Sequence, residues 1–230
     1  VSVGDKVQLT ATVKEFNTGT TSNSVTTAHT VTELTSPTSV SVLSSGNSIT
    51  PTVITLPLAS DAEFERLEGM LVTINSPLTV SQNYFLGRYG QLTLSAGGRL
   101  VKPTNVLRPG SAAQAMATSN ALRTILLDDG TSVQNPDPTP YLAADNTVRA
   151  GDTVSSVTGV IDYGLATSST AGFGLYKIHP TSSVSFNRVN ARTTTPPPCV
   201  PGKPAATPTR KAGQQTSKPR SEEHTSELQS

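Results

Sequence analysis

The chain lacks tryptophan and has a single cysteine, and only 4% of its residues are aromatic and 14% charged. One cysteine cannot close a disulfide within the chain, which excludes a disulfide-stapled mini-protein. No apolar run approaches the roughly 20 residues that a membrane-spanning helix requires. The scarcity of charge excludes a coiled coil and a histone-like basic protein.

Serine and threonine are abundant instead, at 62 of 230 residues. Ser, Thr and Val are poor helix formers, whereas Val and Thr favour strands. The composition therefore predicts an all-β fold rather than a helical bundle.

The formal net charge of +1 combines three unlike regions. Residues 1–195 carry 12 Lys/Arg and 13 Asp/Glu, residues 196–219 carry four basic residues and no acid, and residues 220–230 carry one Arg and three Glu. The part expected to fold is thus close to neutral. Any nucleic-acid surface on it must be local.

The end of the chain has an unusual composition. Residues 220–230 (RSEEHTSELQS) resemble the translation of a common short-read sequencing adapter, and we interpret them as an artefact. Residues 193–219 are rich in Pro and poor in apolar residues, which predicts a disordered linker or tail. On this interpretation the natural protein continues beyond the fragment.

Alternation of apolar and polar residues predicts most of the strands. Residues 60–69 indicate a short helix, because Ser60 and Glu63 fit a capping box and Gly69 ends the turn. An Ala-rich run predicts a second helix within 111–121. The predicted strands are 6–14, 25–32, 39–43, 49–58, 70–75, 91–95, 124–127, 153–162 and 174–179.

An internal repeat indicates two related β-barrel units. Residues 1–7 (VSVGDKV) match residues 148–154 (VRAGDTV), and in both copies a Gly-Asp turn precedes a strand. We expect Asp5 and Asp152 to fix these turns by hydrogen bonds to their own backbone. The predicted domains are a partial unit over 1–58 and a second unit over 59–192.

An ordered series of short motifs resembles the N-terminal region of secreted bacterial endonucleases that join OB-fold-like domains to an endonuclease/exonuclease/phosphatase catalytic domain. The resemblance covers roughly residues 1–190. The motifs are 67–72 (LEGMLV), 87–90 (GRYG), 92–95 (LTLS), 100–105 (LVKPTN), 127–130 (LDDG), 134–138 (QNPDP), 141–142 (YL), 148–154 (VRAGDTV) and 159–163 (GVIDY).

The resemblance implies OB-fold-like Greek-key barrels, one partial and one near-complete, from a secreted or periplasmic parent nuclease. Phosphodiester hydrolysis of that class uses Mg²⁺ or Ca²⁺ in a C-terminal catalytic domain, which this chain lacks. No Asn-Glu-His cluster is present, so no catalytic residue and no cofactor is assigned to the fragment. It is expected to be inactive, and to have no membrane partner.

The residues themselves show one marked segregation of charge. No acid occurs from Gly69 to Leu127, and five cations lie there beside several aromatic residues. OB-folds bind single strands by pairing a basic groove with stacking rings. This composition favours single-stranded DNA or RNA as the ligand. The candidate binding residues are Tyr84, Arg88, Tyr89, Arg99, Lys102, Arg108 and Arg123.

Two alternatives stay open. Tyr84 and Phe85 can instead pack in the core while the cations are scattered solubility charges. The module can also be a structural spacer, or bind an extracellular carbohydrate or surface, because abundant Ser/Thr and low charge fit those roles equally well.

Other polar residues carry weaker signals. Asp128, Asp129 and Asp137 have loop oxygens suited to Ca²⁺, but their spacing favours an ordinary turn and capped loop. His29 and His179 each lack a partner in the sequence pattern and are expected to be packed or edge residues rather than ligands. Cys199 lies in the predicted tail and has no sign of activation.

Overall fold

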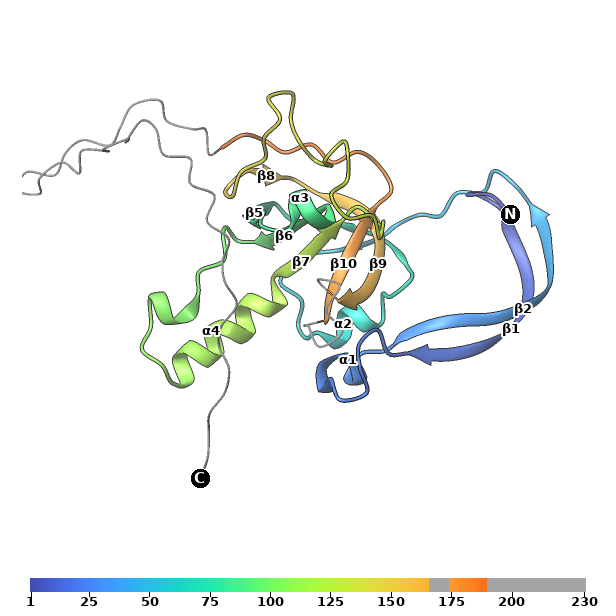
Figure 1. Cartoon of the computed structure of the whole chain (residues 1–230), viewed down its shortest axis with the longest axis horizontal. Helices are drawn as coiled ribbons and strands as arrows, with labels where there is room; N and C mark the ends of the chain where they lie inside the picture. The colour runs from blue at the N-terminus through green and yellow to red at the C-terminus, as the bar shows by residue number, and fades with distance from the viewer. Residues whose placement is uncertain (166–173, 190–230) are drawn as a thin grey trace, which may run out of the picture. The chain divides into compact units, whose positions relative to one another are not determined.

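The computed structural model describes residues 1–165 and 174–189. The predicted linker at 193–219 and the adapter-like 220–230 lie outside the described residues. The predicted all-β class is confirmed, because two sheets dominate and the helices are short (Figure 1). No helix in the described part of the chain is long and apolar enough to cross a membrane.

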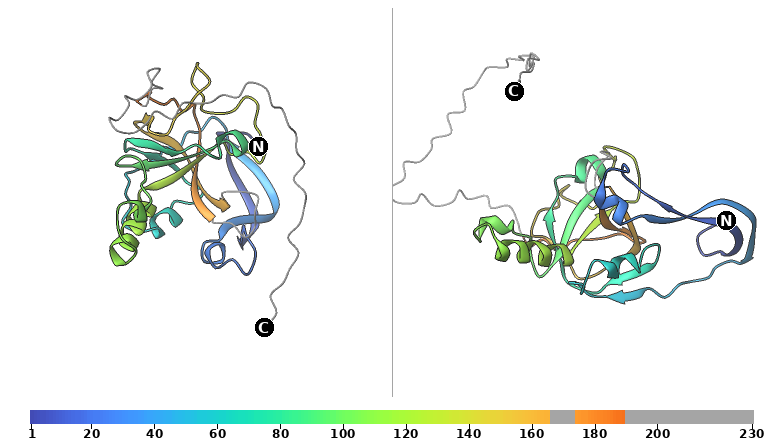
Figure 2. Two further views of the ribbon diagram at one scale, coloured as in Figure 1. Left: turned by 60° about the vertical axis from the view of Figure 1, so that its left-hand side comes forward. Right: turned by 90° about the horizontal axis from the view of Figure 1, so that it is seen from below.

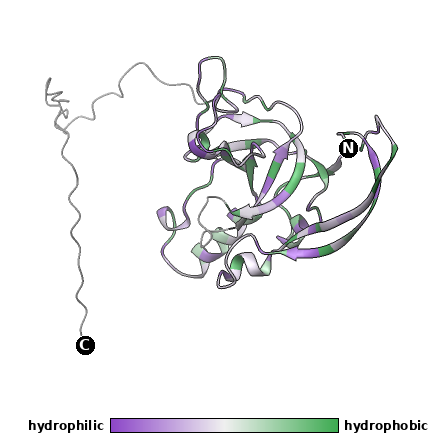
Figure 3. Ribbon diagram, turned by 45° about the vertical axis from the view of Figure 1, so that its right-hand side comes forward, coloured by the Kyte–Doolittle hydropathy of each residue, from purple (hydrophilic) through white to green (hydrophobic). Residues whose placement is uncertain are grey.

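The smaller sheet is a two-stranded antiparallel ribbon of β1 (Lys6–Phe16) and β2 (Val31–Ser44). Its side chains are exposed or half-buried throughout, so it buries no core of its own. Hydrophobic segments occur at intervals along it as well as on the strands of the larger sheet (Figure 3). The ribbon contacts the rest of the chain at the start of β2, where the Thr32 N–H donates to Glu68 Oε1 at 3.1 Å. Glu68 in turn forms an isolated bridge with Ile161 of the larger sheet.

The larger sheet has eight strands in the order β3-β4-β9-β10-β7-β6-β5-β8 and curls into a half-barrel (Figure 2). Two neighbouring pairs are parallel, β3 with β4 and β10 with β7, and the other pairs are antiparallel. The strands are β3 (Thr52–Ile54), β4 (Leu71–Ile74), β5 (Leu78–Gln82), β6 (Gln91–Ala96), β7 (Thr124–Asp128), β8 (Thr153–Val154), β9 (Val157–Leu165) and β10 (Gly174–Pro180).

The core lies on the inner face of this sheet, where alternate residues of its strands point. Strand β9 alternates buried and half-buried residues along most of its length, the pattern of a strand with one face on the core. The fully buried side chains of the core include Val72, Ile74, Leu78, Val80, Leu92, Leu94, Leu127, Ile161 and Ile178.

Within residues 1–165 and 174–189, five short helices connect the strands. The helices predicted near residue 62 and over 111–121 are both present. The helices are α1 (Ser24–Ala28), α2 (Ala62–Glu65), α3 (Leu86–Tyr89), the 3₁₀ helix η1 (Pro103–Asn105) and α4 (Ser111–Leu122).

Four local predictions were wrong. The single strand predicted over 153–162 is two strands, β8, which pairs with β5, and β9, which pairs with β4 and β10. Residues 24–28 form α1 instead of a strand, because Asn23 Oδ1 accepts from the N–H groups of Val25 and Thr26 and caps a helix start. The predicted strand over 49–58 shrinks to β3, between the prolines at 51 and 57. Helix α2 is capped by Asp61, whose Oδ1 accepts from the Ala62 N–H, rather than by Ser60.

The repeated Gly-Asp turns have the same local geometry. Asp5 Oδ2 accepts from the Ser2 N–H at 2.7 Å, and Asp152 Oδ2 accepts from the Arg149 N–H at 2.8 Å. The glycine before each Asp has a left-handed φ, +91° and +105°, as such a turn requires. The predicted turn role of both aspartates is therefore confirmed.

Arg188 joins the second of these turns to a neighbouring loop. Its Nε lies 3.3 Å from Oδ2 of the fully buried Asp152, and its Nη1 lies 2.7 Å from Oδ1 of the exposed Asp145. The hydrogen bond from the Arg188 side chain holds the pKa of Asp145 at about 2, well below its ordinary value.

This depressed pKa predicts an acid-sensitive contribution to folding. The ion pair between Asp145 and Arg188 stabilises the fold fully above the unfolded pKa of about 4. That contribution is lost as the pH falls from there toward the folded value of about 2. Carboxyl-carbon NMR of the folded chain should show Asp145 titrating near pH 2. Titration of Asp145 near pH 4 would contradict the pairing.

Candidate nucleic-acid interface

Three aromatic rings and one guanidinium form a surface at helix α3, which we call the α3 surface: Tyr84, Phe85, Arg88 and Tyr89. Tyr84 is 77% exposed, and its ring meets that of Phe85 edge to face at a centroid distance of 5.0 Å. The centroids of the Phe85 and Tyr89 rings lie 5.8 Å apart. Tyr84 is therefore not a core residue, and its ring is open to a ligand.

Local sequence explains why this surface forms. Leu86 is buried and anchors the single turn of α3, which leaves the neighbouring aromatic residues nearer the solvent. Gly90 ends the turn with a left-handed φ of +66°, and its N–H donates to Leu86 O at 2.9 Å. The loop that contains Asn135 supports the turn from outside, since the Asn135 N–H donates to Arg88 O at 2.9 Å.

Arg88 is oriented by its neighbour in the sequence. Its Nε donates to the Tyr89 hydroxyl at 3.3 Å, and its guanidinium carbon lies 5.5 Å from the centroid of the Tyr89 ring. The side chain is exposed, so the planar cation faces solvent beside the rings. A guanidinium in this position can pair with a phosphate while a base stacks on an adjacent ring.

Arg123 has a different role. Its Nη1 donates to Ala96 O at 2.6 Å and to Gly98 O at 2.9 Å, and its other nitrogens donate to Asn120 Oδ1. The guanidinium thus holds the turn that follows β6 onto the start of β7. Because its N–H groups already donate to these oxygens, Arg123 has few donors left for a phosphate.

The other predicted cations follow β6 rather than precede it. Arg99 and Lys102 are exposed on the loop after β6, and Arg108 is exposed between η1 and α4. The loop is tied back to β5, because the Leu100 N–H donates to Ser81 Oγ at 2.8 Å. The predicted residues therefore form two groups. Tyr84, Arg88 and Tyr89 lie at α3, before β6, whereas Arg99, Lys102 and Arg108 follow β6.

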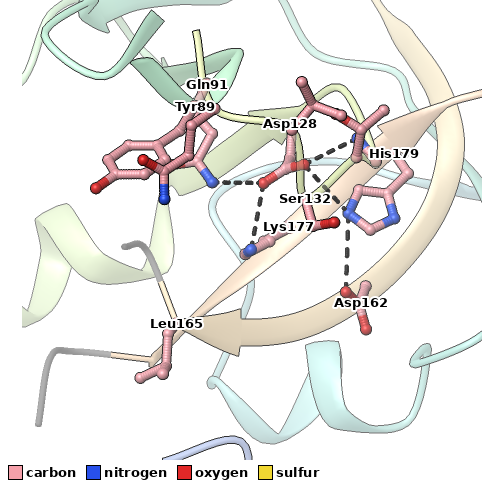
Figure 4. Close-up of a pocket in the computed structure, with 12 residues that line it drawn as sticks. Tyr89, Gln91, Asp128, Ser132, Asp162, Leu165, Lys177 and His179 are labelled. Atoms are coloured by element: carbon pink, nitrogen blue, oxygen red, sulfur yellow. Dashed lines mark hydrogen bonds and ion pairs between the residues drawn. The ribbon is translucent and has the colours of Figure 1, made fainter. Parts of the chain in front are cut away.

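A pocket of about 350 Å³ opens beside the α3 surface and shares Tyr89 with it (Figure 4). Its polar lining comes from four neighbouring strands of the larger sheet: Gln91 of β6, Asp128 of β7, Asp162 of β9, and Lys177 and His179 of β10. The parallel pairing of β7 with β10 brings Asp128 next to the two β10 side chains.

Asp128 is the centre of this pocket and is almost fully buried. Its Oδ2 accepts from Gln91 Nε2 at 2.6 Å and lies 3.2 Å from Lys177 Nζ. Its Oδ1 accepts from the Gly130 N–H at 2.9 Å. A buried carboxylate is stable here because a cation and two donors satisfy it.

His179 lies between two carboxylates. Its Nε2 is 3.6 Å from Asp128 Oδ1 and 3.7 Å from Asp162 Oδ2 (Figure 4). The sequence pattern gave His179 no partner because its neighbours come from other strands. The alternation of Lys177 and His179 on one face of a strand was the one local signal available.

The predicted turn at Asp128 and Asp129 is confirmed. Asp128 caps the Gly130 N–H, and Asp129 Oδ1 accepts from the N–H and hydroxyl of Thr131. Across residues 1–165 and 174–189, no group of three or more His, Cys, Asp or Glu residues is placed to hold a metal ion.

His29 is packed, as predicted, but it has partners. Its Nδ1 lies 3.2 Å from the Tyr176 hydroxyl and 3.7 Å from Glu65 Oε2, and the same hydroxyl donates to Glu65. The pKa of the Tyr176 phenol is raised, first by burial and then by its contact with Glu65. This cluster ties α1, and with it the ribbon, to β10.

A model of the family described as Domain of unknown function (DUF8508) matches residues 59–191. The chain belongs to the DUF8508 family. No curated protein and no solved structure matches it. The matched DUF8508 residues include the whole α3 surface, the second group of cations and all the residues that line the pocket.

Proposed function

We propose that the chain binds single-stranded nucleic acid at the α3 surface. The observation that carries this proposal is the 77% exposure of Tyr84 in a series of aromatic contacts that ends beside Arg88. Stacking of a base on an exposed ring contributes about 1–3 kcal/mol whatever the base, which suits a sequence-tolerant contact.

The charge around this surface supports the proposal. The segment from Gly69 to Leu127 carries five cations and no acid. Arg88 is exposed at the rings, and Arg99, Lys102 and Arg108 are exposed along the following segment. These last three cations follow the far end of β6, so a strand that stacks at α3 would have to extend along β6 for its phosphates to reach them.

We further propose that binding serves to position a strand for a separate catalyst. The motif resemblance to secreted bacterial nucleases supports this role and an extracellular location. In nucleases of that kind, a C-terminal catalytic domain carries out hydrolysis with Mg²⁺ or Ca²⁺. In this proposal, the residues of the present chain only hold the strand.

Titration of the full chain with a single-stranded oligonucleotide of about ten residues tests the binding proposal. We expect binding at about 50 mM salt that weakens roughly tenfold or more at about 200 mM, because phosphate contacts release counterions. Absence of binding at the lower salt would overturn the proposal. Binding of a neutral polysaccharide instead, unaffected by salt, would assign the exposed ring to carbohydrate.

A further inference from the structure

A second pocket lies at the end of the larger sheet where β7 and β10 begin. Its volume is about 320 Å³, within the range of small-molecule sites. Helices α1 and α2, which lie beside the start of β10, and the end of α4 complete its wall (Figure 1). Most of its lining is apolar, including Val25, Leu122, Ile125 and Leu175, and no Lys or Arg of the described residues lines it.

Four aromatic rings line this pocket and contact one another. The Phe64 ring stacks on that of Tyr176 at a centroid distance of 5.2 Å. The rings of Tyr163 and His29 lie 5.0 Å and 5.9 Å from the same Tyr176 ring. Because aromatic rings favour offset and edge-to-face contacts, a ligand that is itself aromatic can extend this cluster.

The hydrogen bonds of Tyr176 fix the position of the proton on His29. The Tyr176 hydroxyl donates its single proton to Glu65 Oε2, because an ionised carboxylate can only accept. Burial, and then the contact with Glu65, raise the pKa of this hydroxyl, so the proton stays on Tyr176. His29 Nδ1 lies 3.2 Å from the same hydroxyl oxygen and is therefore the donor in their contact.

A neutral His29 that carries its proton on Nδ1 has a lone pair on Nε2. No donor within residues 1–165 and 174–189 contacts this nitrogen. The His29 side chain keeps 27% of its surface exposed, so a molecule in the pocket can reach the ring. The pocket thus offers a hydrogen-bond acceptor beside a largely apolar and aromatic wall.

We propose that this pocket binds a small phenol, whose ring packs against Phe64 and Tyr176 and whose hydroxyl donates to Nε2 of His29. A phenol combines an apolar ring with a neutral donor, and it brings no charge that would need a partner in the pocket. The proposal is independent of strand binding, because the second pocket shares no residue with the α3 surface.

The test is an NMR titration of the full chain with three probes built on the same methylated ring: para-cresol, para-methylanisole and toluene. We expect para-cresol to bind about fivefold or more tightly than the other two, because only its hydroxyl can donate to His29 Nε2. The amide signals of Leu122, Ile125 and Leu175 should shift during the titration, since these residues line the pocket.

Long-range proton–nitrogen NMR of the His29 ring is a second measurement, and it needs no ligand. We expect Nδ1 to carry the proton when the imidazole is neutral. The variant Tyr176→Phe removes the acceptor of that proton, so it should show more of the Nε2–H form and lose the preference for para-cresol. Tyr141→Phe is the matched control and should change neither result, since Tyr141 lies outside the pocket and its buried hydroxyl has no hydrogen-bond partner among the described residues.

Selective binding of para-cresol, with the His29 proton on Nδ1, would support the proposal. Equal binding of the three probes, no binding, shifts confined to other parts of the chain, or a proton on Nε2 in the unaltered chain would each overturn it. Tighter binding of para-methylbenzylamine than of para-cresol would also overturn it, because the pocket would then hold a cation at the Asp61 carboxylate. The comparison of probes uses the unaltered chain and so does not depend on the folding of any variant.

Discussion

Replacing both Tyr84 and Arg88 with Ala should lower the affinity for a single-stranded oligonucleotide by about 10–100-fold. Tyr84 is exposed and bears little on the core, so its removal takes away a stacking surface without opening a cavity. Arg88 contributes a phosphate contact beside it. Fluorescence anisotropy of a labelled oligonucleotide measures the change, and the thermal midpoint of unfolding should stay close to that of the unaltered chain.

Matched substitutions make this prediction specific. Tyr84→Phe keeps the ring and should retain most of the affinity. Arg66→Ala removes one exposed positive charge at the end of α2 and should have little effect, because Arg66 lies outside the α3 surface. If Arg66→Ala weakened binding as much as Arg88→Ala, the contact would be general electrostatic attraction rather than a site at α3.

The second large effect concerns the strand pairing that builds the pocket. Gly159 lies in β9 opposite Pro180 of β10, and a Cβ at this position would lie only 2.3 Å from the backbone oxygen of His179. Backbone cannot rotate away as a side chain can, so the two strands would have to separate. We expect Gly159→Ala to lower the free energy of unfolding by about 3 kcal/mol, measured by urea denaturation.

Gly164 provides the control within the same strand. A Cβ there would meet only the end of the Lys177 side chain, at 3.6 Å, an ordinary contact. Gly164→Ala should therefore leave the stability unchanged or raise it slightly, because alanine has less conformational freedom to lose on folding. Equal destabilisation by the two substitutions would show that β9 and β10 are not packed as described.

Local patterns were sufficient to predict much of the fold. Alternation over 6–14 and 174–179 identified strands that become β1 and β10, and the Ala-rich run identified α4. The repeated Gly-Asp turns could also be predicted from the sequence, because the hydrogen bonds of Asp5 and Asp152 each join residues only three positions apart. Helix α1 was missed, because a single Asn cap outweighed the strand preference of its Thr and Val residues.

The candidate site was predictable only in part. The α3 surface is contiguous in sequence, so its composition pointed to it before its exposure was known. The pocket is not contiguous: Asp128 meets Lys177 and His179 through a parallel pairing of β7 with β10, and sequence spacing carries no signal of that pairing. Arg123 illustrates the converse, since its charge suggested binding whereas its hydrogen bonds hold a turn.

The most direct test of strand binding at α3 is the salt dependence of oligonucleotide affinity in the unaltered chain and in Arg88→Ala. Each phosphate contact contributes about 0.7 to the slope of log affinity against log salt for a single strand. The account predicts that the variant binds more weakly and with a slope smaller by about that amount. Identical slopes and affinities for the two proteins would show that the strand, if it binds, does so elsewhere.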